Sequence, residues 1–315
     1  MIVTVTLNAA QDRTVSVPNF HLDGRNRAIE SLTLPGGKGV NVARALRRLG
    51  QPVVATGLAG GRVGTYLIEE LTAEGVLNDF VRIGEESRTS TAVVDPTGAQ
   101  QTEINEVGPT VDEAELSILY EKIQYLSSGA DVFVLAGSLP SNVPPDIYGQ
   151  FVELLRKRDV FTVVDTAGPP FRRCLSAHPS LVSPNIREAE EIVGYEFNDE
   201  ADLAEGAKAL VQMGAGGVLI HGVDGCVARL APHGERKLQT YQVQFPISDV
   251  VSTVGSGDSF LAGFLSAWLQ KAPPEQALAQ AVATGAANTL QLGAGVFDLE
   301  DVAAYQRQVE VRVLE

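Results

Sequence analysis

Residues 253–264 read Thr253-Val-Gly-Ser-Gly-Asp-Ser-Phe-Leu-Ala-Gly-Phe264, with Gly255 and Gly257 directly before an apolar run that is typical of a helix. Glycine lets the backbone approach a ligand closely, and the first turn of a helix offers unpaired N–H groups to an anion. Asp258 lies between this turn and the helix, where its carboxylate is placed to accept a proton. These are the parts that a phosphoryl-transfer enzyme needs. The alternative is that Asp258 only caps the N-terminus of a buried helix.

Outside this stretch, apolar segments alternate with helical patterns. Strands are predicted at 2–7, 53–56, 132–135, 161–164 and 217–220, and helices at 39–49, 65–74, 112–126, 145–157, 200–213, 258–269 and 274–290. Strands that are apolar throughout are buried on both faces, which is typical of a mainly parallel sheet covered by helices. The predicted fold class is therefore α/β, with three α/β/α layers. Because no linker or repeat divides the sequence, we expect a single domain over residues 1–315.

Two regions depart from this rhythm. Short segments of mixed polarity occur at 14–17, 28–34, 90–95 and 101–105, and the last two are joined by the turn residues Pro96-Thr-Gly98. Strands with one solvated face favour a small sheet that stands off the main body. We expect a β flap, or lid, over the active site, assembled from residues 12–35 and 88–106. The alternative is an antiparallel extension of the main sheet at its edge.

Composition narrows the possible partners. Lysine and arginine number 24 against 39 aspartate and glutamate, giving a formal net charge of −15. An acidic surface argues against nucleic acid as a partner, although a local basic cluster in a cleft can still hold a small anion. The two cysteines and four histidines lack the spacing of a tightly bound zinc or haem. No apolar run approaches the roughly 20 residues of a membrane span, so we expect a cytoplasmic protein.

A second glycine-rich segment reads Pro35-Gly-Gly-Lys-Gly-Val-Asn-Val-Ala43, with Lys38 and Asn41 near the start of a predicted helix. It lacks the G-x-x-x-x-G-K-[ST] spacing of a Walker A loop. It also fails as a dinucleotide fingerprint, because Val42 stands where the third glycine belongs. This argues against a nicotinamide-dependent oxidoreductase.

Taken together, the two glycine-rich segments resemble the signatures of the ribokinase-like (PfkB) carbohydrate kinase family. The resemblance covers essentially the whole chain and is closest to the phosphosugar branch, which includes 1-phosphofructokinases and tagatose-6-phosphate kinases. The segments that resemble this branch are Thr6-Leu-Asn-Ala-Ala-Gln-Asp12, Gly24-Arg-Asn-Arg-Ala28, Ser87-Arg-Thr-Ser-Thr91, Gln101-Thr-Glu-Ile-Asn105, Gly137-Ser-Leu-Pro140 and Ser183-Pro-Asn-Ile-Arg-Glu188. The resemblance implies a ribokinase-like fold and ATP-dependent phosphorylation of a phosphosugar, preferably fructose 1-phosphate. Tagatose 6-phosphate and fructose 6-phosphate are the alternatives.

The resemblance also assigns catalytic roles. Asp258 is the expected base that takes the proton from the sugar hydroxyl. The backbone N–H groups of Gly255, Ser256 and Gly257 are expected, with that of Asp258, to form the anion hole for the transferring phosphoryl group.

Substrate-binding residues follow in the same way. Asp12 is expected to bind sugar hydroxyls beside Gly37 and Asn41, whereas Arg27, Lys38 and Arg88 are expected to hold the phosphate of the substrate. Asn105 on the flap and Ser138 after a predicted strand complete this set: Asp12, Arg27, Gly37, Lys38, Asn41, Arg88, Asn105 and Ser138. A polar solvated face explains Asn105 equally well.

For the nucleotide, the resemblance assigns Asn185, Glu188, Gly222, Gly225 and Asn288. Glu188 is expected to bind Mg²⁺ through water, as Mg²⁺ prefers, and Asn288 is expected near the adenine. Three positions depart from the family pattern. Ala9 stands where proline is usual. Ser183 stands where many relatives carry lysine, and His221 stands where a small hydroxyl residue is common.

Two rival functions remain open: a kinase of nucleosides or unphosphorylated sugars, and a non-catalytic sensor of sugar phosphates on a kinase scaffold. Arg27 and Arg88 argue against the first, because they would lie unpaired over a neutral sugar. The presence of Asp258 and its glycine turn argues against the second. The edge strands of the flap favour a homodimer in which two flaps clasp each other.

Overall fold

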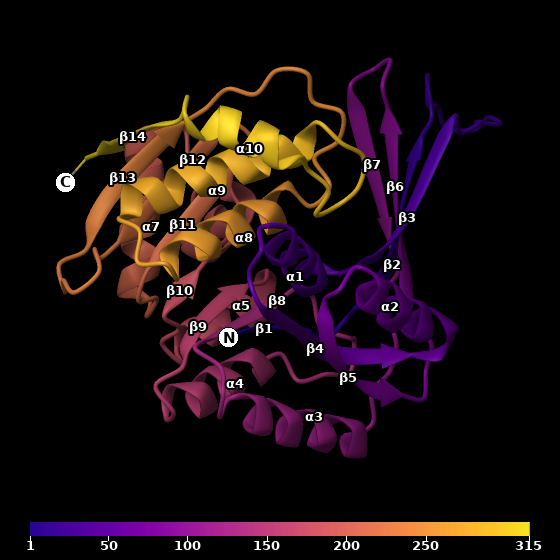
Figure 1. Ribbon diagram of the computed structural model, residues 1–315, viewed down its shortest axis with the longest axis horizontal. Helices are drawn as coiled ribbons and strands as arrows, with labels where there is room; N and C mark the ends of the chain where they lie inside the picture. Colours follow the sequence, from indigo (N-terminus) through magenta and orange to yellow (C-terminus); the bar gives the residue numbers. More distant parts are fainter. Residues whose placement is uncertain (315) are drawn as a thin grey trace.

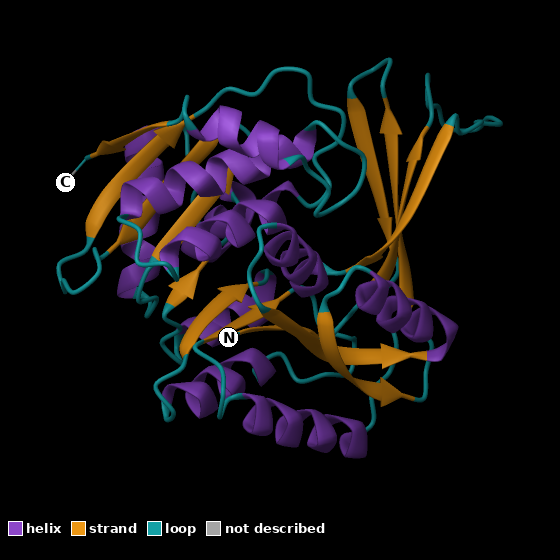
Figure 2. Ribbon diagram, viewed as in Figure 1, coloured by secondary structure: helices purple, strands orange, loops and turns teal. Residues whose placement is uncertain are grey.

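The computed structural model describes residues 1–314, which form two sheets and the helices around them (Figure 1, Figure 2). The strands are β1 (Ile2–Thr6), β2 (Ala10–Ser16), β3 (Glu30–Gly36), β4 (Val53–Gly60), β5 (Leu77–Ile83), β6 (Arg88–Asp95), β7 (Gln100–Asn105), β8 (Val132–Ala136), β9 (Phe161–Asp165), β10 (Leu181–Val182), β11 (Val218–Gly222), β12 (Gly225–Leu230), β13 (Gln239–Gln244) and β14 (Glu310–Val313). The helices are α1 (Lys38–Arg48), α2 (Gly61–Ala73), α3 (Glu113–Leu126), α4 (Ile147–Arg156), α5 (Gly168–Leu175), α6 (Ile186–Val193), α7 (Glu200–Gln212), α8 (Ser256–Trp268), α9 (Pro274–Thr289) and α10 (Leu299–Gln306).

The large sheet has the strand order β14-β13-β12-β11-β10-β9-β8-β1-β4-β5. From β5 to β11 all neighbouring strands are parallel, and β12, β13 and β14 add an antiparallel edge. Alternate side chains enter two separate cores. Ile2 and Val132 pack on the side of α1, α2, α8 and α9, whereas Val3 and Phe133 pack on the side of α3 to α7. Both faces of the sheet are therefore buried, and the predicted three-layer α/β/α fold is confirmed.

All five predicted strands of the main sheet and all seven predicted helices occur, with boundaries shifted by a few residues. The prediction missed the short strand β10, the antiparallel strands β12 to β14, the edge strand β5 and the helices α5, α6 and α10. In β12, β13 and β14 polar residues interrupt the apolar ones and no apolar run exceeds three residues, so the continuous apolar signal is absent. Within residues 1–314 no helix combines the length and apolarity needed to cross a membrane.

The small sheet has the order β3-β2-β6-β7 and is separate from the large one. Figure 1 shows it standing at one side of the molecule, with its strands leading away from the body. The predicted flap is thus present as a separate sheet, and the alternative of an extension at the edge of the main sheet is wrong. Gly36 and Ala10 pair at the end of the sheet where α1 begins, so the small sheet is attached at the carboxyl end of β1.

Candidate active site

A cavity of about 1090 Å³ lies between the small sheet and the carboxyl ends of the parallel strands. The turn after β8, the residue that ends β9 and the turn after β11 all line it. In α/β sheets ligands bind at this edge, near the point where the strand order reverses. Here the reversal lies at β1, because the chain continues to β4 and β5 on one side and to β8 on the other.

The turn before α8 places a buried carboxylate in this cavity. Gly255 is the N-cap of α8 with φ 73°, a left-handed conformation that favours glycine. A Cβ at this position would lie 2.2 Å from the Cβ of Ala294, so the site also lacks room for a side chain. Asp258 is the third residue of the helix and makes no capping hydrogen bond. Its Oδ2 instead accepts a hydrogen bond of 2.8 Å from Asn41 Nδ2. The capping-only interpretation of Asp258 is therefore wrong.

The surroundings of Asp258 make it a stronger base than an exposed carboxylate. Burial, with the nearby Asp165 carboxylate, raises the pKa of Asp258 to about 7, whereas Lys38 and Asn41 lower it. A group with this pKa exchanges a proton readily near neutral pH. The sequence alone could not show this shift, because it does not reveal which side chains surround position 258.

The pH dependence of turnover follows from this pKa. Only the ionised form of Asp258 accepts a proton, so kcat/KM is expected to rise tenfold per pH unit below about 7 and to level off above it. Steady-state rates measured from pH 5 to 9 with saturating nucleotide test this expectation. A plateau that already begins at pH 5 would contradict it, since that result requires an ordinary carboxylate pKa.

A second carboxylate, which is half-buried, faces the same cavity from the small sheet. Asp12 lies in β2, and the backbone of Gly37 hydrogen-bonds to it. Gly36 leaves the room for it, because a Cβ there would lie 2.0 Å from the Asp12 carboxyl carbon. Burial raises the pKa of Asp12 to about 6, while Gly37 and Arg88 lower it. The structure thus brings Asp12, Gly37, Asn41 and Asp258 to one end of the cavity.

Lys38 bridges two carboxylates instead of pointing freely into the cavity. Its Nζ lies 2.6 Å from Asp165 Oδ1 and 3.1 Å from Glu188 Oε1. Burial lowers the pKa of Lys38, but these two carboxylates more than offset the effect and hold it above its usual range. Lys38 was expected to hold the phosphate of the substrate, whereas its partners place it beside Glu188, one of the residues expected at the nucleotide.

Asp165 was missed in the sequence. It is buried at the end of β9 and lines the cavity. The sequence signal that could have identified Asp165 was its position directly after the predicted strand 161–164, at the edge where parallel strands place ligand contacts.

Glu188 is fixed by a capping box at the start of α6. Asn185 Oδ1 accepts a hydrogen bond from the Glu188 N–H, and Glu188 Oε2 accepts one from the Asn185 N–H.

The remaining predicted substrate residues fall into two groups. Arg88, Asn105 and Ser138 line the cavity. Arg88 is held in place by hydrogen bonds from Nε to the Asn8 carbonyl at 3.2 Å and from Nη1 to the Glu106 carbonyl at 3.1 Å.

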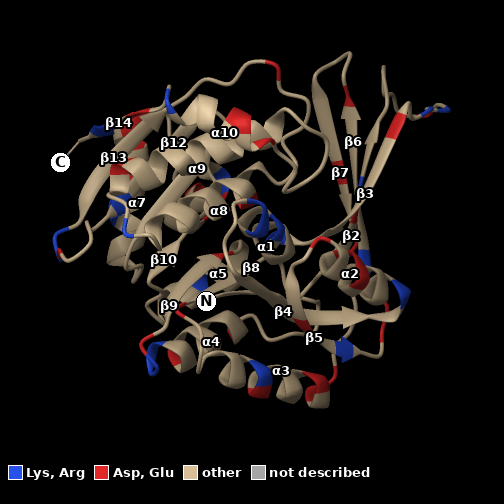
Figure 3. Ribbon diagram, in the orientation of Figure 1, with Lys and Arg blue, Asp and Glu red and all other residues tan. Residues whose placement is uncertain are grey.

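Arg27 does not line the cavity of its own chain. It lies in the exposed connection between the outer ends of β2 and β3, and Figure 3 colours Lys and Arg positions blue at this tip of the small sheet. The distance along a strand is about 3.3 Å per residue, so this tip is roughly 13 Å farther out than Asp12. Arg27 was expected to hold the phosphate of the substrate, but within one chain it lies outside the cavity.

The predicted nucleotide residues also divide. Asn185, Glu188, Gly222 and Gly225 line the cavity, whereas Asn288 is fully buried behind the glycine turn. Its Nδ2 donates to the carbonyl of Val254 at 2.9 Å, and its Oδ1 accepts from Ser259 Oγ and the Gly295 N–H, both at 2.8 Å. Asn288 therefore supports the turn from behind, and the expected contact with adenine is corrected.

His221 packs against the glycine turn from the side of β11. Its ring is buried, which lowers its pKa to about 4 and keeps it neutral, and it lies 5.1 Å from the ring of Phe260. A Cβ at Gly257 would lie 2.7 Å from His221 Cε1. The missing side chain at 257 is therefore matched to the presence of histidine at 221.

This close contact leads to a rescue prediction. Gly257→Ala is expected to displace the turn by a few tenths of an ångström and to lower kcat on the order of tenfold. Adding His221→Ser removes the ring that the new methyl group meets, so the double variant is expected to recover most of that loss. Steady-state kinetics of both single variants and the double variant measure this. If the double variant loses as much kcat as the two single variants combined, the His221 ring does not interfere with the turn.

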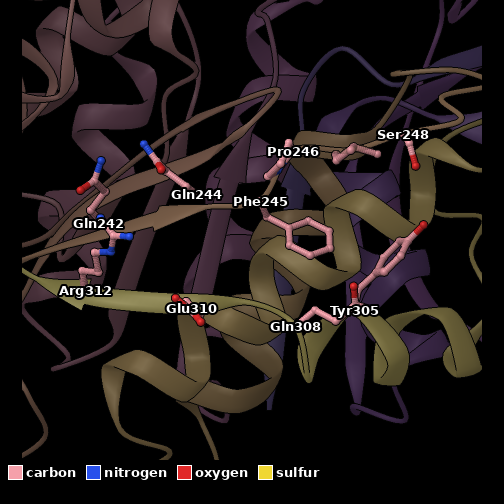
Figure 4. A pocket seen from close by; sticks show the side chains of 10 residues that line it. Gln242, Gln244, Phe245, Pro246, Ser248, Tyr305, Gln308, Glu310 and Arg312 are labelled. Carbon is pink, nitrogen blue, oxygen red and sulfur yellow. The ribbon is translucent and has the colours of Figure 1, made fainter.

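A second cavity, of about 420 Å³, opens between the end of β13, β14 and the C-terminal end of α10 (Figure 4). It is lined by Gln242, Gln244, Phe245, Pro246, Ile247, Ser248, Tyr305, Gln308, Glu310 and Arg312. It shares Phe245 and Ile247 with the main cavity but contains none of the predicted site residues. Apart from Arg27 and Asn288, all the predicted site residues line the main cavity.

A model of the pfkB family of carbohydrate kinases matches residues 7–301. The chain belongs to this family. A 1-phosphofructokinase of Borreliella burgdorferi is 31% identical over 312 residues, which cover 99% of this chain and 98% of the relative. A tagatose-6-phosphate kinase of Staphylococcus epidermidis is 30% identical over 316 residues, covering 99% of each chain. Phosphofructokinase-2 of Escherichia coli, solved with substrates and products, has a TM-score of 0.88 at 28% identity and 98% coverage of each chain.

Membership of the pfkB family fixes the class of reaction. The protein is a sugar-phosphate kinase, a phosphotransferase that uses ATP as the phosphoryl donor. The expected ribokinase-like fold is confirmed, and so is the expected resemblance to the phosphosugar branch of the family. A nicotinamide-dependent oxidoreductase is ruled out.

Proposed function

We propose that this kinase phosphorylates D-fructose 1-phosphate on its 6-hydroxyl group, giving fructose 1,6-bisphosphate and ADP. The observation that carries the proposal is the Asp258 carboxylate, held by Asn41 at the start of α8 in a cavity that also contains Arg88. A base and a separate guanidinium group suit a substrate that bears both a hydroxyl and a phosphate. Tagatose 6-phosphate and fructose 6-phosphate meet the same requirement and are the alternatives.

In the proposed reaction, Asp258 takes the proton of the sugar hydroxyl as its oxygen attacks the γ-phosphorus of ATP. The new O–P bond forms while the bond from the γ-phosphorus to the bridging oxygen of ADP breaks. Charge on the transferring phosphoryl group is stabilised by the backbone N–H groups of Gly255, Ser256, Gly257 and Asp258 at the N-terminus of α8. Asp12 and Asn41 orient the sugar.

The residues at the nucleotide end fit a magnesium ion. Glu188 and Asp165 present carboxylate oxygens to the cavity, and hard oxygen ligands are those that Mg²⁺ prefers. When bound, Mg²⁺ would neutralise charge on the nucleotide phosphates, with Glu188 and Asp165 holding it directly or through water. Lys38 lies between these two carboxylates, and in the proposed reaction its positive charge would help to stabilise the transferring group.

The test is ADP release by the purified protein with MgATP and a panel of acceptors: fructose 1-phosphate, fructose 6-phosphate, tagatose 6-phosphate, fructose and adenosine. The proposal predicts the highest kcat/KM for fructose 1-phosphate and little turnover of fructose or adenosine. Preference for another phosphosugar would move the assignment to that alternative. Preference for an unphosphorylated acceptor would overturn the role of Arg88 and leave that of Asp258.

Arg88 gives the matching variant. Arg88→Ala is expected to raise KM for the phosphosugar about 10- to 100-fold with kcat changed much less, because a charged hydrogen bond to the substrate phosphate is lost. Arg82→Ala is the control, since Arg82 bonds to the Gly61 carbonyl and Thr65 Oγ1 outside the cavity. An unchanged KM in Arg88→Ala would favour the rival kinase of unphosphorylated sugars.

We further propose a homodimer formed through the small sheets. Exposed apolar side chains on these strands and their connection support this arrangement, notably Leu22, Ile29 and Ile104. A clasped partner is also the arrangement in which Arg27 could reach a substrate phosphate, that of the other chain. A monomeric mass by light scattering at micromolar concentration would contradict the dimer.

We place the protein in the cytoplasm, where Cys174 and Cys226, both free and buried, would remain reduced.

A further inference from the structure

One side chain of the small sheet reaches across to the segment that leads into the glycine turn. Gln101 lies on β7, the outer strand of the small sheet, and is half-buried among exposed neighbours. Its Oε1 accepts hydrogen bonds from Ser252 Oγ and from the Thr253 N–H, both at 3.1 Å. The Thr253 hydroxyl lies 3.4 Å from the same oxygen. In the part of the chain that the structure describes, Gln101 makes all the hydrogen bonds that join the small sheet to residues 245–255.

The segment that Gln101 contacts is continuous with the catalytic turn. The Val254 N–H donates to Ser252 Oγ at 3.2 Å, and the Val254 carbonyl accepts from Asn288 Nδ2. Gly255, the N-cap of α8, follows directly. Hydrogen bonds therefore run from Gln101 through residues 252–254 to Asn288, which fixes the turn from behind.

The other end of the Gln101 amide bonds to a side chain that lines the cavity. Its Nε2 donates to Glu103 Oε1 at 2.9 Å, and Glu103 Oε2 lies 3.5 Å from Asn105 Nδ2. Glu103 and Asn105 both line the cavity from β7. One amide thus connects side chains that a bound sugar would meet with the backbone that precedes the anion hole.

An apolar contact supports the same closure from the opposite edge of the small sheet. A Cβ at Gly293 would lie 2.8 Å from Leu32 Cδ2 and from Leu34 Cδ1, so these β3 leucines lie against the loop after α9. Apolar contact of this kind is non-directional. The directional part of the contact is supplied by Gln101.

We propose that Gln101 is a positioning residue that latches the small sheet onto residues 252–253 and so couples its closure to the placement of the Gly255–Asp258 turn. This rests on the proposed function, in which that turn holds the transferring phosphoryl group. When the latch is closed, the small sheet covers the cavity and the turn is held in the geometry seen here. When it is open, the Thr253 N–H loses its partner and water can reach the phosphoryl group.

The test compares Gln101→Ala with Gln100→Ala, a neighbouring exposed residue on the same strand whose side chain has no hydrogen bond in the described structure. Hydrogen exchange of the ligand-free protein is followed in peptides that cover residues 250–258. Exchange there is expected to be several-fold faster in Gln101→Ala and unchanged in Gln100→Ala. In the same variant kcat is expected to fall about tenfold, with KM for the phosphosugar changed less. The rate of ATP hydrolysis measured without sugar is expected to rise relative to the rate of phosphoryl transfer measured with the phosphosugar.

A pair of substitutions separates the latch from a general loss of packing. Gln101→Glu places a second carboxylate against Glu103 and is expected to open the latch. Adding Glu103→Gln restores an amide–carboxylate pair in the opposite sense and is expected to return exchange at 250–258 toward that of the unchanged protein.

Equal exchange and equal hydrolysis in the Gln101 and Gln100 variants would overturn the proposal. If the unchanged protein transfers no phosphoryl group while the exchange difference persists, the proposed function fails and the latch contact stands.

Discussion

Asp258→Asn is expected to lower kcat by about 10³-fold while leaving KM for both substrates within a few-fold, because the substitution removes the base and keeps the shape. The Asn41 amide can still donate to the new side-chain oxygen, as it does to Asp258 Oδ2 at 2.8 Å. The glycine turn and its N–H groups are unchanged, so a residual rate from positioning and charge stabilisation should remain. Steady-state and single-turnover assays of ADP release measure this loss.

The same variant has a predictable effect on stability. The pKa of Asp258 is raised by burial from 3.8 to about 7, so between these pH values the folded protein binds a proton that the unfolded chain does not. The free energy of unfolding therefore falls as pH rises through this window, and above about 7 the buried charge is fully destabilising. Asparagine has no such charge, so Asp258→Asn is expected to melt at a higher temperature than the unchanged protein at pH 8 and at a similar one at pH 4. A variant that loses activity and also melts lower at pH 8 would show that Asp258 is structural.

The sequence predicted the layers of this fold well because buried parallel strands carry a strong local signal. Strands such as β1 and β8 are buried throughout and mainly apolar, and a glycine-rich turn precedes both α1 and α8. The antiparallel strands β12 to β14 lack that signal, because polar residues such as Arg229, Thr240 and Gln242 interrupt their apolar runs. This explains why β12 to β14 were missed although they form long antiparallel pairs.

The site was predictable in its members and less so in their partners. Asp12, Asn41 and Asp258 come together because the small sheet and the first turns of α1 and α8 all line the cavity at the carboxyl ends of the parallel strands. Arg27 was misplaced because a sequence does not show in which direction the strands of a flap lead. Asn288 was misassigned because a polar residue in an apolar helix is equally compatible with contact to a ligand and with a buried hydrogen-bond hub.

Lys38 illustrates the same limit and leads to the second large expected effect. Its position at the start of α1 was evident, but its partners Asp165 and Glu188 are 127 and 150 residues away in the chain. Lys38→Met would leave these carboxylates and Asp258 without their shared cation. Because the positive charge lowers the pKa of Asp258, its removal is expected to move the acid limb of kcat/KM to higher pH.

The expected loss of kcat in Lys38→Met is about 10²- to 10³-fold at pH 7, since both the ionised base and a charge near the phosphoryl group are affected. The free energy of unfolding of Lys38→Met is expected to be about 2 kcal/mol lower than that of the unchanged protein. The loss of a fully buried ion pair would cost more, but the Lys38 side chain is about a third exposed. Lys122→Met is the matched control, because Lys122 pairs with Asp79 outside the cavity. This variant is expected to lower the free energy of unfolding by at most about 1 kcal/mol and to leave the pH profile of kcat/KM unchanged. If the acid limb of Lys38→Met stays where it is in the unchanged protein, Lys38 does not control the ionisation of Asp258, and its ion pairs serve only to join α1 to β9 and α6.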